Sequence, residues 1–310
     1  MKAIRIHRFG GPDVLQIDDR PIPQPVDDEV LLRVVAAGIN PVDNKVRKDG
    51  GRFKKDGDLP APMGRDVVGR IEALGTRAHN MLSEGQRLFA MVGFDRGSFA
   101  EFVIVKATEM AAVPDELDDE AAAAVPLAAL TAWQGLVDHG GLDDGKRVLI
   151  HGGSGGVGHF AVQIAKAHGA TVYATASGDG VGFVEKIGAD RGIDYKRERF
   201  EDIATDVDIV LDLIGGDTQQ RSWDVLAPGG IIVSTLTPPQ PPEGMGEGRR
   251  GVDFMVDPKG ADLQKIADLI GAGKIRPHVS GSFPLERIGE AAERLANGHV
   301  LGKLVITVGA

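Results

Sequence analysis

Three glycines in one short segment have the spacing of a turn that binds phosphate. Residues 153–158 read Gly-Ser-Gly-Gly-Val-Gly, between an apolar run at 148–150 and a stretch with apolar residues at helical spacing. In this context the first glycine permits a tight turn, the second lets the backbone approach a pyrophosphate, and the third allows close helix–strand packing. N–H groups at the start of the helix then face the phosphates. The pattern predicts a dinucleotide site formed by Gly153, Ser154, Gly155, Gly156, Val157 and Gly158.

The residues after the turn indicate which dinucleotide is bound. An NAD site has an acidic residue about 20–25 positions further on, where it accepts a hydrogen bond from the ribose 2′-hydroxyl. Here Ser177 stands in that region, and the nearest acid, Asp179, falls past the expected end of the strand. Ser177 leaves room for a 2′-phosphate. Tyr195, Lys196 and Arg197 could supply further contacts, although the two basic residues could equally be solvated charges. We therefore expect NADPH.

Length and charge limit the class of protein. The chain has 310 residues, which suggests two domains, and a formal net charge of −10. Nucleic acids and acidic membranes both require a basic face, so neither is an expected partner. The chain has no cysteine, which removes disulfides, thiol nucleophiles and cysteine-bound zinc. No segment has the pattern of a signal peptide or a membrane span, and we expect a cytoplasmic protein.

The secondary structure expected to position these residues differs between the first and the later part of the chain. Residues 1–115 are β-rich, with alternating runs at 29–36, 66–74 and 100–106. From 147 to about 236, strand and helix patterns alternate, which predicts a parallel sheet covered by helices. The strands expected there are 148–150, 171–175, 192–194, 209–212 and 231–235. A Pro- and Gly-rich loop at 237–251, a helix at 260–273 and a strand at 303–308 follow.

Beyond the glycine turn, several further segments occur in the order known from one family. They are AAGINPVD (36–43), MGRDVVG (63–69), GSFAEF (97–102), PLAALTAW (126–133), LAPGG (226–230) and GKLV (302–305). Over nearly its full length the chain resembles the zinc-independent quinone oxidoreductase, or zeta-crystallin-like, branch of the medium-chain dehydrogenase/reductase superfamily. The resemblance implies an α/β fold with two domains. One is a GroES-like β-barrel catalytic domain from residues 1–121 and 258–310, and the other is a doubly wound Rossmann NADPH-binding domain from residues 122–257.

The resemblance also bears on metal binding. Zinc-dependent relatives have a cysteine where Asn40 stands, and a histidine next to an acid where Arg65 and Asp66 stand. We therefore expect no metal site, and hydride transfer to an already electrophilic acceptor rather than alcohol oxidation. None of the eight histidines has a partner at metal-ligand spacing, so we expect these side chains to be satisfied or solvated.

Three residues are candidates for the acceptor side of the site. The resemblance places Asn40 beside the nicotinamide, where its amide could hold acceptor or cofactor; otherwise it caps a turn before Pro41. Asp43 either lines the site or caps a helix that would begin around Asn44. Lys45 either contacts the acceptor or a phosphate, or is a surface charge.

Further cofactor contacts are expected beyond the turn. They are Thr131, Leu213, Ile214, Thr235, Leu236, Phe254, Val256 and Lys303. The pairs 213–214 and 235–236 end two successive strands, at the edge where open α/β sheets bind ligands. The resemblance places Thr131 near the nicotinamide, the 254–256 segment by the carboxamide, and Lys303 at the pyrophosphate. As alternatives, Thr131 would bond back to its own helix, 254–256 would be core, and Lys303 would be a surface lysine.

The predicted activity is hydride transfer from NADPH, without a metal, to a quinone or an α,β-unsaturated carbonyl. An enoyl-thioester reductase and a non-catalytic NADPH-binding protein stay open as alternatives. The expected partner is the small-molecule quinone or enone substrate, with no nucleic acid and no membrane. We also expect a homodimer, because the resemblance implies pairing through an edge strand of the nucleotide domain and the apolar run 231–236 would suit it.

Overall fold

The computed structural model describes residues 1–80, 82–246 and 248–309. The chain forms two compact units: unit 1 is Met1–Leu127, Pro258–Gly271 and Pro277–Ala310, and unit 2 is Ala128–Asp257 and Ala272–Arg276. The sequence analysis placed the first boundary after residue 121. Unit 1 extends to Leu127, whose N–H donates to the buried carboxylate of Asp66 over 2.6 Å. Positions 81 and 310, which belong to the predicted catalytic domain, and position 247, which belongs to the predicted loop, lie outside the described residues.

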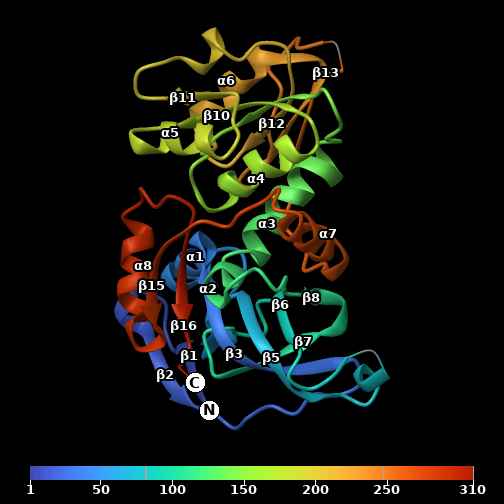
Figure 1. The fold of residues 1–310 in the computed structure, drawn as a ribbon. Helices are drawn as coiled ribbons and strands as arrows, with labels where there is room; N and C mark the ends of the chain where they lie inside the picture. Colours follow the sequence, from blue (N-terminus) through green and yellow to red (C-terminus); the bar gives the residue numbers. More distant parts are fainter. Residues whose placement is uncertain (81, 247, 310) are drawn as a thin grey trace. The chain divides into compact units, whose positions relative to one another are not determined.

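Unit 1 is built on two β-sheets (Figure 1). The larger has the order β15 (Val279–Pro284), β16 (Lys303–Thr307), β3 (Glu29–Ile39), β5 (Asp66–Leu74), β6 (Arg87–Met91) and β8 (Met110–Ala112), with β7 (Phe102–Lys106) also paired to β3. All its pairs are antiparallel except β15–β16. The smaller has the order β2 (Leu15–Asp19), β1 (Lys2–Ile6) and β4 (Ala61–Pro62). The helices of unit 1 are α1 (Pro41–Asp49), α2 (Asp119–Ala123), α7 (Gly260–Gly271) and α8 (Ile288–Ala296).

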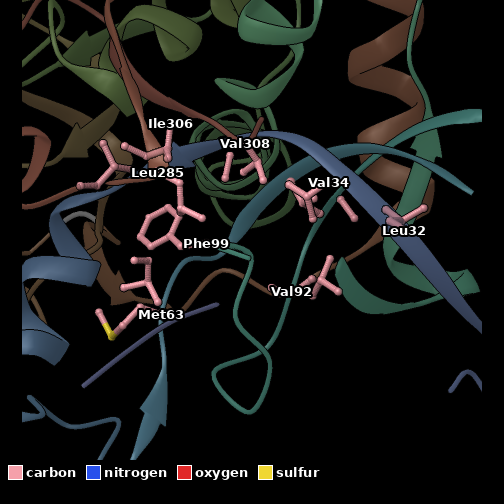
Figure 2. Close-up of a cluster of buried hydrophobic side chains, with 14 of the residues drawn as sticks. Leu32, Val34, Met63, Val92, Phe99, Leu285, Ile306 and Val308 are labelled. Carbon is pink, nitrogen blue, oxygen red and sulfur yellow. The ribbon is translucent and has the colours of Figure 1, made fainter. Parts of the chain in front are cut away.

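The core of unit 1 joins both ends of the chain. Apolar side chains from β3, from the 63–99 region and from the C-terminal β16 bury one another, and Figure 2 shows Phe99, Leu285 and Ile306 pointing into a common cluster. Leu32 and Val34 lie in the same core and alternate with the exposed Arg33, which is the period-two pattern of a half-buried strand. Burial of this apolar surface is what holds the C-terminal segment on the N-terminal strands.

Unit 2 is a parallel sheet with helices (Figure 1). Its strand order is β11 (Arg191–Asp194), β10 (Thr171–Ala176), β9 (Arg147–Ile150), β12 (Val207–Asp212), β13 (Leu226–Ser234) and β14 (Arg250–Asp253), and every neighbouring pair is parallel. The helices are α4 (Gly156–Ala167), α5 (Asp179–Lys186) and α6 (Gly216–Arg221), and α3 (Pro126–Trp133) leads in from unit 1. α4 packs on β9 and β10, and α5 packs on β10 and β11. The predicted α/β class with a doubly wound nucleotide domain is confirmed.

Three details differ from the sequence analysis. β14 begins inside the stretch predicted as a loop at 237–251, and its glycine and flanking polar residues hide a strand pattern. β14 covers β13, so the apolar run 231–236 belongs to an inner strand and not to an edge. The apolar run therefore gives no support to a homodimer, which stays a prediction from the resemblance alone. α1 begins at Pro41, earlier than the predicted start around Asn44.

No helix among the described residues is long and apolar enough to cross a membrane. The cytoplasmic location stays a prediction.

Candidate functional site

The glycine turn lies at the point of the sheet where the strand order reverses. From β9 the chain proceeds to β10 and β11 on one side, and later to β12, β13 and β14 on the other. The turn follows the carboxyl end of β9, and Leu213 and Ile214 follow the carboxyl end of its neighbour β12. Open parallel sheets bind ligands outside the carboxyl ends of the strands at such a reversal. The structure thus brings together two of the segments that the sequence analysis predicted for the cofactor.

The packing around the turn fits the roles expected of its glycines. A Cβ at Gly158 would stand 2.2 Å from the carbonyl oxygen of Gly152 and 2.7 Å from the Cα of Gly153, so no larger residue fits between helix and turn. A Cβ at Gly155 would meet only the Gly152 oxygen, at 3.5 Å. The backbone at Gly155 is therefore open to an approaching group, and it is the N-cap of α4, with no side chain occupying the helix end. The residues present fit a bound pyrophosphate.

Ser177 and Tyr195, the two residues predicted to bind the 2′-phosphate, lie side by side. β10 and β11 are parallel neighbours, and the Tyr195 N–H donates to the Ala176 carbonyl oxygen at the ends of these strands over 3.1 Å. This brings the Ser177 hydroxyl to 3.2 Å from the Tyr195 hydroxyl, to which it donates. Tyr195 is 56% exposed, so both hydroxyls can be reached by a ligand. The Arg197 side chain is exposed near Asp194 and belongs to the solvated alternative.

Asp212 is a site residue that the sequence analysis missed. It is fully buried at the end of β12, and one carboxylate oxygen accepts from the backbone N–H groups of Ile214 (3.0 Å) and Gly215 (2.8 Å). The other oxygen accepts from Gln219 Nε2 (2.8 Å) and Ser234 Oγ (3.0 Å). A buried carboxylate needs hydrogen-bond donors around it. An aspartate at the end of an otherwise apolar strand is therefore the sequence signal that could have identified Asp212.

The same network fixes the other pair of predicted residues. Leu236 N–H donates to Ser234 Oγ over 3.2 Å, and Thr235 N–H donates to the Asp212 backbone oxygen over 3.3 Å. The loops after β12 and β13 therefore share Asp212 as their common anchor.

The remaining predicted residues of unit 2 lie in three further places. Thr131 is buried in α3. Phe254 follows β14, donates its N–H to the Ser234 oxygen over 3.1 Å, and packs its ring against His139 with centroids 4.6 Å apart. Val256, two residues on, is half-buried. Their predicted contacts with the cofactor stay predictions.

In unit 1 the candidate residues form a buried ionic cluster. Lys303 Nζ donates to Asp66 Oδ2 (3.1 Å), Asn40 Oδ1 (2.5 Å) and the Ile39 backbone oxygen (3.0 Å). Asn40 Nδ2 donates in turn to Asp66 Oδ2 over 2.9 Å. Lys303 is 3% exposed and Asp66 is 0% exposed, so the ion pair is shielded from solvent. A buried charge pair of this kind is tolerated only when its remaining hydrogen-bonding groups are satisfied.

This cluster limits what its members can do for a ligand. An ammonium has three hydrogens, and Lys303 already has three oxygen acceptors. Both ends of the Asn40 amide also contact the cluster. As the structure stands, Lys303 and Asn40 hold the start of β16, the end of β3 and the start of β5 together. Their predicted contacts with pyrophosphate and nicotinamide stay predictions.

Asp43 takes part in the cap of α1, as its capping alternative requires, and its predicted place in the acceptor site stays a prediction. It is the third residue of α1, not the N-cap, and its Oδ2 accepts from the backbone N–H of the N-cap Asn40 over 2.8 Å. It also lines a small pocket with Val46, Pro62, Met63, Gly64, Arg65, Phe94 and Arg96, which has room for about one water molecule. Burial raises the pKa of Asp43 to about 7, and the nearby Asp66 charge adds to the increase, although the Asn40 N–H, Lys303 and Arg65 oppose it. Asp43 can therefore hold a proton near neutral pH.

Arg65 also lines that pocket, whereas Lys45 is not among its lining residues. Arg65, at the position of the histidine in zinc-dependent relatives, is buried; its Nε donates to the Val92 oxygen over 2.9 Å, and its guanidinium lies 3.9 Å from the centre of the Phe94 ring. Lys45 is exposed on α1, as its surface alternative requires. Within the residues that the structure describes, no group of three or more His, Asp or Glu side chains is placed to hold a metal ion.

Two histidines near the glycine turn have hydrogen-bonding partners. His159 is buried in α4, with its Nδ1 3.0 Å from the Gly155 oxygen. His151 is fully buried at the end of β9 between the hydroxyls of Thr175 and Ser222. The prediction of satisfied histidines is confirmed at these two positions.

The fold and the turn define an oxidoreductase with a GroES-like domain and a Rossmann nucleotide domain, and comparison with known proteins agrees. Residues 26–115 match the alcohol dehydrogenase GroES-like domain, and residues 187–306 match a domain family described as zinc-binding dehydrogenase. The chain is 36% identical to the NADPH-dependent alkenal/one oxidoreductase of Arabidopsis thaliana chloroplasts, over 99% of this chain and 79% of that protein.

Solved structures give the same result. The quinone oxidoreductase of Coxiella burnetii is 36% identical, with a TM-score of 0.90, over 100% of this chain and 99% of that one. The Escherichia coli quinone oxidoreductase complexed with NADPH is 25% identical, with a TM-score of 0.85, over 99% and 100% of the two chains. The chain belongs to the quinone oxidoreductase branch of the medium-chain dehydrogenase/reductase superfamily. The family and the class of enzyme predicted from the sequence are confirmed.

Proposed function

We propose that this chain is an NADPH-dependent oxidoreductase that transfers a hydride to a quinone or to an α,β-unsaturated carbonyl. The observation that carries the proposal is the glycine turn, which lies where the strand order of the unit 2 sheet reverses. A ligand can approach the backbone at Gly155, whereas at Gly158 the helix packs directly on the backbone of the turn. Relatives named alkenal/one oxidoreductase and quinone oxidoreductase, and a quinone oxidoreductase structure with NADPH, support the cofactor and the class of acceptor.

Different residues of this chain bind different parts of the dinucleotide. The N–H groups of the turn and the start of α4 bind the pyrophosphate, and the hydroxyls of Ser177 and Tyr195 bind the 2′-phosphate. Asp212 holds the loops after β12 and β13 in place beside the turn. When bound, the nicotinamide supplies the hydride.

The reduced acceptor also needs a proton, and unit 1 contains a group that can hold one. The addition of a hydride to an enone leaves an enolate, and addition to a quinone leaves a hydroquinone anion. Asp43 carries its proton on a carboxyl that faces a pocket, with a pKa raised to about 7 by burial. It is our candidate for the group that holds this proton.

The proposal is tested by assays of the purified chain with NADPH or NADH against naphthoquinone, methyl vinyl ketone and crotonyl-CoA. We expect NADPH to be oxidised with the quinone or the enone, and more efficiently than NADH. With NADPH deuterated at C4, the reduced enone should carry one deuterium on carbon. Turnover confined to crotonyl-CoA would favour an enoyl-thioester reductase. Tight NADPH binding without turnover of any acceptor would favour a non-catalytic protein.

A further inference from the structure

A continuous chain of hydrogen bonds runs from the glycine turn through His151 to helix α6. The Gly152 N–H donates to Thr175 Oγ1 over 3.1 Å, and Thr175 Oγ1 lies 3.2 Å from His151 Nδ1. On the other side of the imidazole, His151 Nε2 lies 2.9 Å from Ser222 Oγ, which donates to the Thr218 carbonyl oxygen over 2.7 Å. His151 and Ser222 are 0% exposed and Thr175 is 4% exposed, so the three side chains have little access to water.

The direction of each bond follows from counting hydrogens. A carbonyl oxygen only accepts, so the single hydroxyl hydrogen of Ser222 is used on Thr218. Ser222 Oγ can then only accept from the imidazole, which requires a proton on His151 Nε2. Thr175 Oγ1 already accepts from Gly152, and it satisfies a bare Nδ1 by donating its own hydrogen. Of the two neutral tautomers, only the one with its proton on Nε2 completes every bond.

The surroundings of His151 favour the neutral form. Burial lowers the pKa of His151 to about 4, and the positive charge of Arg221 on α6 acts in the same direction. The carboxylates of Asp212 on β12 and Glu201 act in the opposite direction. The Phe200 ring meets the imidazole edge to face, with centroids 4.7 Å apart, and covers that side of the imidazole with apolar surface.

Thr175 is the residue through which the chain of hydrogen bonds contacts the glycine turn. It holds the turn twice: its hydroxyl accepts from Gly152 N–H, and its backbone oxygen accepts from Gly153 N–H over 2.9 Å. Gly152 has φ +73°, a left-handed conformation, so this peptide's position depends on such contacts. The other end of the chain of bonds is the backbone of α6, which follows the loop of Leu213 and Ile214.

We propose that His151, as the neutral imidazole protonated on Nε2, is a positioning residue that holds the glycine turn in the conformation that binds the pyrophosphate of NADPH. The imidazole is fully buried and acts through Thr175. This inference rests on the proposed NADPH site and adds to it the residue that preorganises the turn.

The test combines histidine NMR with cofactor binding. In protein labelled with ¹⁵N-histidine, the His151 signals, identified by their absence in His151→Gln, should show the neutral Nε2–H form from pH 8 down to pH 5.5. A protonated imidazole or the Nδ1–H form in that range would overturn the proposal. This measurement uses the chain without cofactor, so it is independent of activity.

Binding is measured with Thr175→Val, which removes the hydroxyl but keeps the shape, and with Thr175→Ser, which keeps the hydroxyl. When the turn is no longer held, only a fraction of molecules is competent to bind, and the apparent dissociation constant rises by the inverse of that fraction. We expect the dissociation constant for NADPH to rise about tenfold in Thr175→Val and to stay within about twofold in Thr175→Ser, with kcat at saturating NADPH little changed. His168→Gln, a histidine substitution at the far end of α4, should bind like the original chain.

Unchanged NADPH affinity in a folded Thr175→Val would overturn the inference while leaving the proposed function intact. Failure of the unsubstituted chain to bind NADPH would instead overturn the proposed function, and the positioning role with it. The two failures are therefore distinguishable.

Discussion

The two units each bury a polar network beside their candidate residues, and the networks are of opposite kinds. The cluster of Asn40, Asp66 and Lys303 in unit 1 is ionic and is completed by an ammonium. The hydrogen-bond chain through Thr175, His151 and Ser222 in unit 2 is neutral, and its bonds require one tautomer of the His151 imidazole. Both are almost fully buried. The ionic network depends on charge balance, whereas the neutral network depends on where a single proton lies, so the two should respond differently to substitution and to pH.

The largest effect is expected from breaking the ion pair. Lys303→Met leaves the Asp66 carboxylate buried without its cation, and the loss of one partner of a buried pair costs about 3–5 kcal/mol of unfolding free energy. Both tryptophans, Trp133 and Trp223, lie in unit 2. Far-UV circular dichroism in urea therefore follows the whole chain, while tryptophan fluorescence follows unit 2.

The matched control for that prediction is the double variant Lys303→Met/Asp66→Asn, which removes both charges. It should recover most of the lost stability, because no unpaired charge is left. If the single and double variants unfold at the same urea concentration, the pair is not the source of the stability that we assign to it.

A smaller loss is expected from the neutral network. Ser222→Ala removes the acceptor of His151 Nε2–H and leaves a buried donor unpaired, at a cost of about 1–3 kcal/mol. The loss should appear in urea unfolding followed by tryptophan fluorescence. Thr205→Ala, which removes the hydroxyl of an exposed threonine in unit 2, serves as the control and should change stability by less than about 0.5 kcal/mol. Equal effects in the two variants would contradict the buried role of Ser222.

The pH dependence of stability should have opposite signs at His151 and at Asp43, whose carboxylate accepts from the Asn40 N–H beside the ionic cluster. His151 has a folded pKa of about 4, below its usual 6.5, so the unfolded chain binds more protons between these values and unit 2 loses stability as the pH falls from 6.5 to 4. His151→Leu cannot bind that proton. We expect the fluorescence-detected urea midpoint to fall between pH 7 and pH 5 in the original chain, and to fall less in His151→Leu. An identical pH slope would show that His151 does not titrate as described.

Asp43 should give the smallest effect and the reverse sign. Its folded pKa of about 7 lies above the usual 3.8, so its contribution is fully present below 3.8 and is lost as the pH rises through 7. Asp43→Asn keeps an oxygen that can accept from Asn40 N–H. Relative to the original chain, the variant should gain stability between pH 6 and pH 8 in urea unfolding followed by circular dichroism. A constant difference over that range would contradict the raised pKa.

The same contrast shows what the sequence could and could not predict. The glycine turn, β5 and a parallel sheet covered by helices follow from local patterns, since spacing and alternation are properties of neighbouring residues. The doubly wound order was predicted from the family resemblance. The polar networks do not follow from local patterns, because Lys303 and Asp66 are 237 positions apart and His151 and Ser222 are 71 apart. No local pattern indicates that Lys303 is buried on Asp66 rather than exposed, or that His151 selects one tautomer. β14 was missed because glycine and charged residues give it no strand-like alternation.

The most direct test of the account is a calorimetric titration of the purified chain with NADPH, alongside Gly158→Val. We predict one NADPH bound per chain, and no binding by a folded Gly158→Val, whose side chain would collide with the backbone of Gly152 and displace the turn. No uptake by the original chain, or equal uptake by both proteins, would contradict the claim that this turn holds the dinucleotide.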